Sequence, residues 1–277
     1  DFCLSRGLGD VYKRQLEGIP PVTLALLRFL IVLPFLTALT HYRSRNALGE
    51  RLFKDWKILS ALGLAGVTFY HVFQNLGLQL TTASNSSLII SANPVFITLL
   101  EHFYLRERIT LKRVLGVTLA FFGVILVIRP LEWSLNPSGV TGDLLSLGAA
   151  ICWASYSVLG RKTLSDHGAE KITVSSLIYG TLFLFPVAFA LEKPVLPASV
   201  WLWFLLLILS LLCSGLAYLF WYKVLESASA TEAGVFLFFL PVVSVSIAHF
   251  ALSESLSAPF VAGALLVIVG VVITERG

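Results

Sequence analysis

The sequence predicts an all-α integral membrane protein built as an inverted repeat of two five-helix bundles, and three observations support this prediction. The chain is 57% hydrophobic and 13% charged, with a mean hydropathy of +0.85, whereas soluble domains carry roughly 25% charged residues. Apolar runs recur along the whole length, and about 20 residues suffice for a helix to cross the hydrocarbon layer. The third observation is an internal repeat.

The repeat becomes visible when the sequence is shifted by 147 residues, which places Pro94 on Pro241. Further matched pairs are Phe73 with Phe220, Leu78 with Leu225, Ala83 with Ala230, His102 with His249, Glu107 with Glu254, Gly116 with Gly263 and Gly123 with Gly270. The repeated glycines, with Ala120 between them, favour close packing of helices.

The two copies differ in charge around Glu107 and its mate Glu254. The first copy carries the basic residues Arg106, Arg108, Lys112 and Arg113, where the second has Ser253, Ser255, Pro259 and Phe260. Because cytoplasmic loops collect Lys and Arg, we expect the matched loops on opposite sides of the membrane. Such inverted repeats are typical of secondary transporters.

We expect nine membrane-spanning helices, because lipid requires every backbone polar group to be bonded within the protein. The expected spans are Pro21–Thr40, Trp56–Leu78, Ala83–Tyr104, Leu111–Ile128, Gly142–Gly160, Ile172–Leu191, Val200–Tyr222, Ala230–Leu252 and Ala258–Thr274. Residues 16–129 form the first repeat and residues 141–276 the second.

Residues 1–15 are expected to lie outside the fold. The stretch Ser5–Gln15 resembles an in-frame translation of a sequencing adapter and has no mate in the repeat. The interpretation is an N-terminally truncated chain whose missing first helix would make ten helices and a cytoplasmic N-terminus.

Basic residues alternate between loops, which predicts a multi-pass protein of the plasma (inner) membrane. One set of loops holds Arg43, Arg45, Arg51, Lys54, Lys57, Arg106, Arg108, Lys112, Arg113, Arg161, Lys162 and Lys171, and the opposite set only Arg129 and Lys193. The basic loops are therefore expected to be cytoplasmic.

The net charge is +4, but the basic residues form no continuous stripe along the sequence, so we expect no nucleic-acid partner. Cys3, Cys152 and Cys213 lack the spacing of a metal site, and no cofactor is expected.

Three motifs make the chain resemble the drug/metabolite transporter superfamily, EamA type. They are GIPPVTLALLRF at Gly18–Phe29, LRERIT at Leu105–Thr110 and FWYKVLE at Phe220–Glu226. The resemblance implies two five-helix inverted repeats with both termini cytoplasmic. It also implies secondary active transport of a small metabolite, such as an amino acid, by alternating access. Export is the favoured direction, although the sequence does not distinguish it from import. The resemblance also leaves a homodimer as one possible assembly.

Arg28 is the first candidate for the transport site. It lies about eight residues into its helix, hence roughly 12 Å deep, and an Arg in the membrane costs at least about 2.5 kcal/mol on insertion scales. A structural ion pair or a side chain reaching toward the interface is the alternative. The resemblance favours a functional role.

A second candidate is the triplet His71, Gln74 and Asn75, whose spacing places the three side chains on one helix face. The repeat mates of this triplet are Tyr218, Trp221 and Tyr222. A face that keeps hydrogen-bonding groups in both copies predicts a cavity wall or a gate. Hydrogen bonding between helices is the alternative.

The third candidate is the helix interruption expected at Asn93 and Pro94, matched by Pro241. Pro-broken helices in corresponding positions of two repeats indicate the transport site, so both prolines are hinge candidates. Trp153 and Tyr156 lie near mid-depth of their span, where they form either an aromatic cavity wall or ordinary packing.

Acidic residues provide no convincing buried carboxylate. Glu101, Glu107, Glu232 and Glu254 all fall near helix ends, where interfacial solvation is the favoured interpretation. For a coupling proton, Glu101 and His71 are the candidates. Catalytic motifs are absent from the sequence, so an enzyme is disfavoured. A channel or a non-transporting receptor is the alternative to a carrier.

Thiol labelling tests the predicted topology. Cysteines placed between Arg43 and Lys57 should react only from the cytoplasm, and cysteines near Glu192 only from outside. Labelling of Arg106→Cys and Ser253→Cys from the same side would contradict the inverted repeat.

Overall fold

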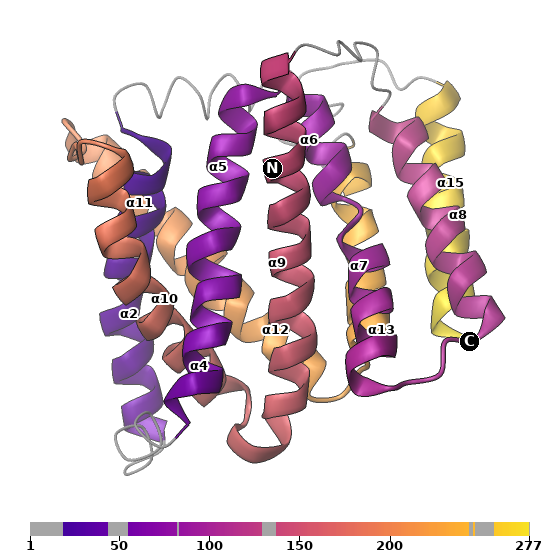
Figure 1. Ribbon diagram of the computed structural model, residues 1–277, viewed down its shortest axis with the longest axis horizontal. Coiled ribbons are helices and arrows are strands. Elements are labelled where there is room, and N and C mark those ends of the chain that lie inside the picture. Colours follow the sequence, from indigo (N-terminus) through magenta and orange to yellow (C-terminus); the bar gives the residue numbers. More distant parts are fainter. Residues whose placement is uncertain are drawn as a thin grey trace. The chain divides into compact units, whose positions relative to one another are not determined.

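The computed structural model describes residues 19–43, 55–81, 83–128, 137–243, 246 and 258–276. These residues form helices joined by short connections (Figure 1). The helices are α2 (Pro21–Arg43), α4 (Trp56–Gly63), α5 (Tyr70–Leu80), α6 (Ala83–Ile90), α7 (Asn93–Leu100), α8 (Leu111–Ile128), α9 (Pro137–His167), α10 (Ala169–Leu191), α11 (Val200–Leu209), α12 (Ala217–Leu225), α13 (Ala230–Val235) and α15 (Ala258–Glu275). Within the described residues, six spans are long and apolar enough to cross a membrane.

Three of the long spans contain a π-helical segment. The segment η3 (Glu101–Leu105) ends the span that begins at Asn85. The segment η2 (Leu64–Phe69) joins α4 to α5, and η4 (Ser210–Leu216) joins α11 to α12. The 147-residue offset maps η2 onto residues 211–216, so both copies widen at the same place. Such local widening often marks a functional position.

The all-α membrane fold is confirmed, and several helix limits differ from the expected ones. Helix α10 begins at Ala169, before the expected Ile172, so Lys171 lies in a helix and not in a loop. Helix α9 is longer than the expected Gly142–Gly160, so Arg161 and Lys162 lie in this helix and not in a loop. Arg161 supports the extension because its guanidinium donates to the carbonyls of Leu225 and Ala228. The expected span Ala83–Tyr104 is divided by a turn at residues 91–92. Residues 1–15 lie outside the described part of the chain.

The chain divides into two compact units, and each draws helices from both repeats. The described residues between 16 and 75 and between 155 and 228 form unit A, and those between 76 and 154 and between 229 and 276 form unit B. In unit A, α10 packs against α2, α4 and η2. Its crossing with α4 is close, since a Cβ on Gly63 would lie 2.5 Å from the backbone nitrogen of Gly180.

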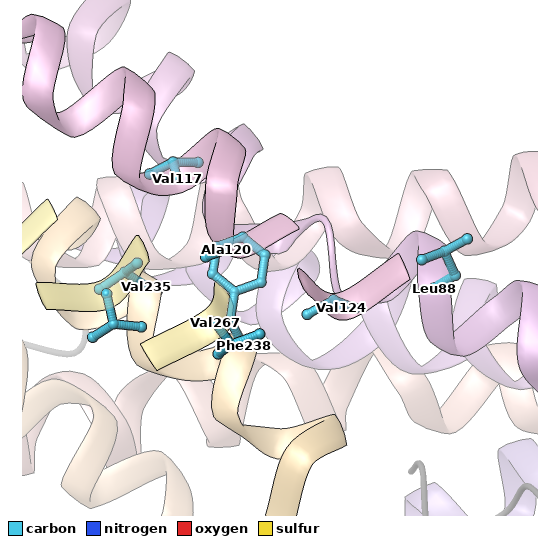
Figure 2. Close-up of a cluster of buried hydrophobic side chains, with 8 residues drawn as sticks. Leu88, Val117, Ala120, Val124, Val235, Phe238 and Val267 are labelled. Carbon is cyan, nitrogen blue, oxygen red and sulfur yellow. The ribbon is translucent and has the colours of Figure 1, made fainter. Parts of the chain in front are cut away.

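Unit B is centred on the pairing of α8 with its repeat mate α15 (Figure 1). A Cβ on Gly116 would lie 2.6 Å from the carbonyl oxygen of Gly270, and one on Gly123 would lie 2.6 Å from that of Gly263. Next to this crossing is the cluster of Figure 2, formed by Leu88, Val117, Ala120, Val124, Val235, Phe238, Val267 and Val271. The glycine-mediated packing predicted from the repeat is confirmed.

Replacing Gly123 by Leu should force α8 away from α15 and lower stability by about 1–3 kcal/mol, as overpacking of a closed core does. Thermal unfolding in detergent measures the effect. Thr118→Leu, on the exposed face of the same helix, is the matched control and should leave the midpoint unchanged. Equal midpoints for the two variants would contradict this packing.

Candidate functional site

A contact between repeat mates lies inside unit A. Nε2 of His71, on α5, is 3.2 Å from Oη of Tyr218, on α12, and 147 positions separate the two residues. Two mates can touch each other only close to the two-fold axis that relates the copies. The two-fold axis that the inverted repeat predicts would therefore pass through this pair.

The hydrogen bonds of Tyr218 assign a proton to His71. The phenol donates to the carbonyl oxygen of Gly66, in η2, at 2.8 Å. Because a hydroxyl has one hydrogen, Tyr218 Oη must accept its bond from His71 Nε2. Both side chains are buried, so the pair links the two repeats in the interior.

Arg28 extends from α2 toward this pair and is half-buried. Its Nε donates to Oγ of Ser214, in η4, at 3.0 Å. The guanidinium also interacts electrostatically with Tyr70, His71 and Tyr218. The bond to Ser214 uses one of the five N–H donors of the guanidinium group, and it fixes the position of this group between α2 and η4.

Aromatic side chains enclose the pair. The ring of Phe29 meets those of His71 and Tyr218 edge-on, with centroid distances of 5.0 and 5.9 Å. Tyr156 is fully buried with its ring 5.0 Å from that of Tyr222, and a Cβ at Gly66 would collide with it. These contacts pack unit A, and a solute-contacting role for Tyr156 and Tyr222 stays a prediction.

The predicted face of α5 is present, and it makes bonds to other groups of unit A. Gln74 is buried and hydrogen-bonded to Tyr70. Asn75 Nδ2 donates to the carbonyl oxygen of Pro21 at 2.9 Å, which holds the start of α2. The cavity-wall role of Gln74 and Asn75 stays a prediction beside these bonds.

The interrupted helices belong to unit B. The turn at residues 91–92 precedes Asn93, which is buried, and Pro94, at the start of α7. In the second copy, the 3-10 segment η5 (Phe236–Phe238) precedes Pro241. Both copies are thus interrupted shortly before the proline, as predicted. The hinge role of the prolines, and a solute contact by Asn93 or by the half-buried Trp153 of this unit, stay predictions.

Two groups of residues were not anticipated. Gly66 and Ser214 are small residues of the π-helical segments. The only sequence signal that could have drawn attention to them is that these two segments lie at matching positions of the repeat. The interfacial interpretation of Glu101 is wrong: the side chain is 2% exposed and accepts the backbone N–H groups of Ala230 and Thr231. Its partners start another helix, far away in sequence.

Comparisons with known proteins agree with this architecture. The model of the EamA-like transporter family matches residues 4–129 and 140–276. A protein of Archaeoglobus fulgidus named as an uncharacterized transporter is 34% identical, covering 95% of this chain and 90% of its own. A Bacillus subtilis protein named as an uncharacterized transporter, YyaM, is 32% identical over 76% of this chain and 70% of its own. A solved crystal structure has the same fold, with a TM-score of 0.82 at 20% identity, covering 99% of this chain and 93% of its own.

Tyr218→Phe should destabilise the protein by about 1–3 kcal/mol, because it leaves the Gly66 carbonyl and the His71 N–H without their buried partner. Thermal unfolding in detergent measures the loss. Tyr222→Phe is the control, since its phenol makes a longer bond of 3.4 Å to the carbonyl of Tyr156. If Tyr222→Phe costs as much as Tyr218→Phe, the axial pair has no special role.

Proposed function

Because this chain belongs to the EamA-like transporter family, we propose that it is a secondary active transporter that exports small metabolites such as amino acids by alternating access. It is a multi-pass protein of the plasma membrane. The observation that supports this mechanism best is the axial contact of His71 with its own repeat mate Tyr218.

An inverted repeat gives a transporter two conformations of comparable energy, one open to each side of the membrane. When each repeat adopts the conformation of the other, the end of the molecule that was open closes and the end that was closed opens. Residues on the two-fold axis keep the same environment in both states. His71 and Tyr218 are therefore suited to remain in contact while the flanking helices rearrange.

Arg28 is the proposed anchor for the solute. A guanidinium binds a carboxylate through paired N–H donors, and the bond from Nε to Ser214 holds this one in place. The solute class that fits best is an anionic or zwitterionic metabolite, and amino acids have the required carboxylate. His71 is our candidate for a coupling proton because it is the titratable side chain of the axial contact with Tyr218.

The orientation follows from charge. Arg106, Arg108 and Arg113 lie at one end of unit B, and we place that end in the cytoplasm on the positive-inside rule. Uptake into inside-out vesicles then corresponds to export from the cell.

Arg28→Ala should lower transport at least about tenfold, which corresponds to about 1.4 kcal/mol of lost interaction with a carboxylate. Uptake of a mixture of radiolabelled L-amino acids into inside-out vesicles of cells producing the full-length protein measures it. Arg108→Ala, on the connection between η3 and α8, is the charge-matched control and should transport normally.

Equal uptake by the two variants at equal expression would contradict the assignment of Arg28. Accumulation against a gradient distinguishes the carrier from a channel, which would only equilibrate the solute. A protein without flux of any amino acid would contradict the proposed solute class.

A further inference from the structure

Glu101 fastens the first repeat to the second within unit B. This residue begins the π-helical segment η3 (Glu101–Leu105), and its carboxylate accepts from the backbone nitrogens of Ala230 at 2.6 Å and Thr231 at 2.8 Å. These N–H groups belong to the first turn of α13. A carboxylate at that position satisfies donors that the helix itself leaves unbonded, and it interacts favourably with the helix dipole.

Arg113, on α8, makes a second connection to the same turn. Its Nη2 is 2.7 Å from Oε1 of Glu232, and the arginine side chain is only 17% exposed. Glu232 also completes a capping box with Ser229. The first turn of α13 is therefore held by two charged side chains of the first repeat.

The inverted copy lacks this arrangement. The repeat mate of Glu101 is Ala248, and that of Arg113 is Phe260. The two-fold symmetry would place an equivalent fastening at the opposite end of the repeat, but alanine and phenylalanine can neither accept a backbone N–H bond through their side chains nor form an ion pair. The sequence thus encodes this pair of charged contacts in one copy only.

We propose that Glu101 and Arg113 form a latch that holds the two repeats together at their cytoplasmic end in the solute-free transporter. This inference depends on the alternating access proposed above, and it identifies what keeps the cytoplasmic end closed. Opening toward the cytoplasm separates the Glu101 carboxylate from two N–H groups and Arg113 from Glu232.

The latch is tested by the accessibility of a cysteine beside it. Thr98 lies on α7, one turn before Glu101, and is 6% exposed. In full-length protein with Thr98→Cys and with Cys3, Cys152 and Cys213 replaced by Ala, a membrane-impermeant maleimide is applied to inside-out vesicles without solute. Glu101→Gln should raise the labelling rate at least about fivefold, the lower end of typical coupling between conformational states.

Glu275→Gln is the matched control, because Glu275 is an exposed carboxylate near the end of α15 in the same unit. It should leave the rate at that of the parent. Equal rates for Glu101→Gln and Glu275→Gln would overturn the latch. If Glu101→Gln does not fold, Arg113→Gln decides: faster labelling than in Glu275→Gln supports the latch, and an unchanged rate overturns it.

The labelling experiment is independent of solute flux. Faster labelling of Glu101→Gln in a protein that transports nothing would keep the latch and refute the proposed transport. Normal flux with unchanged labelling would refute the latch alone.

Discussion

The structure depends on one constraint: within lipid, every backbone N–H and C=O group must find its partner inside the protein. Uninterrupted helices meet this constraint along their length but not at their starts. Three carboxylates compensate at helix starts, Glu192 at α2, Glu226 at α10 and Glu101 at α13. The phenol of Tyr218 reaches a carbonyl within a π-helical segment. These polar side chains therefore lie where the helices begin or are interrupted.

The two copies of the repeat share some interhelical contacts and differ in others. Apolar contacts are repeated faithfully, since Gly116 meets Gly270 as Gly123 meets Gly263, and both contacts obey the same two-fold relation. The charged contacts of Glu101 and Arg113 are not repeated, because their mates are Ala248 and Phe260. In the proposed orientation Glu101 faces the cytoplasmic end, and its mate would face the other side of the membrane. The divergence of polar residues between copies is thus the means by which a symmetric fold acquires a direction.

Much of this architecture was predictable because hydropathy and the 147-residue offset report directly on it. The spans, the glycine crossing and the interruption before Pro94 needed no knowledge of distant contacts. The burial of Glu101 did, because its partner lies 129 positions away and a carboxylate near a helix end ordinarily faces water. The π-helical segments carry no residue signature, since Gly66 and Ser214 resemble any small residue of a membrane helix. Of the residues in this candidate site, the sequence singled out His71, its mate and Arg28 but not the groups that bind them, and their role in transport stays a prediction.

A carrier has to move its helices without leaving backbone groups unbonded in lipid. A helical hydrogen bond forms and breaks together with its neighbours, so a long uninterrupted helix moves as a rigid body. A bond made by a side chain can be exchanged through a change of rotamer. The π-helical segments η2 and η4 and the breaks before Pro94 and Pro241 are places where the helical ladder is locally altered. We infer that these four places bend during the transport cycle, whereas α8 and α15, joined through their glycines, move as one rigid pair.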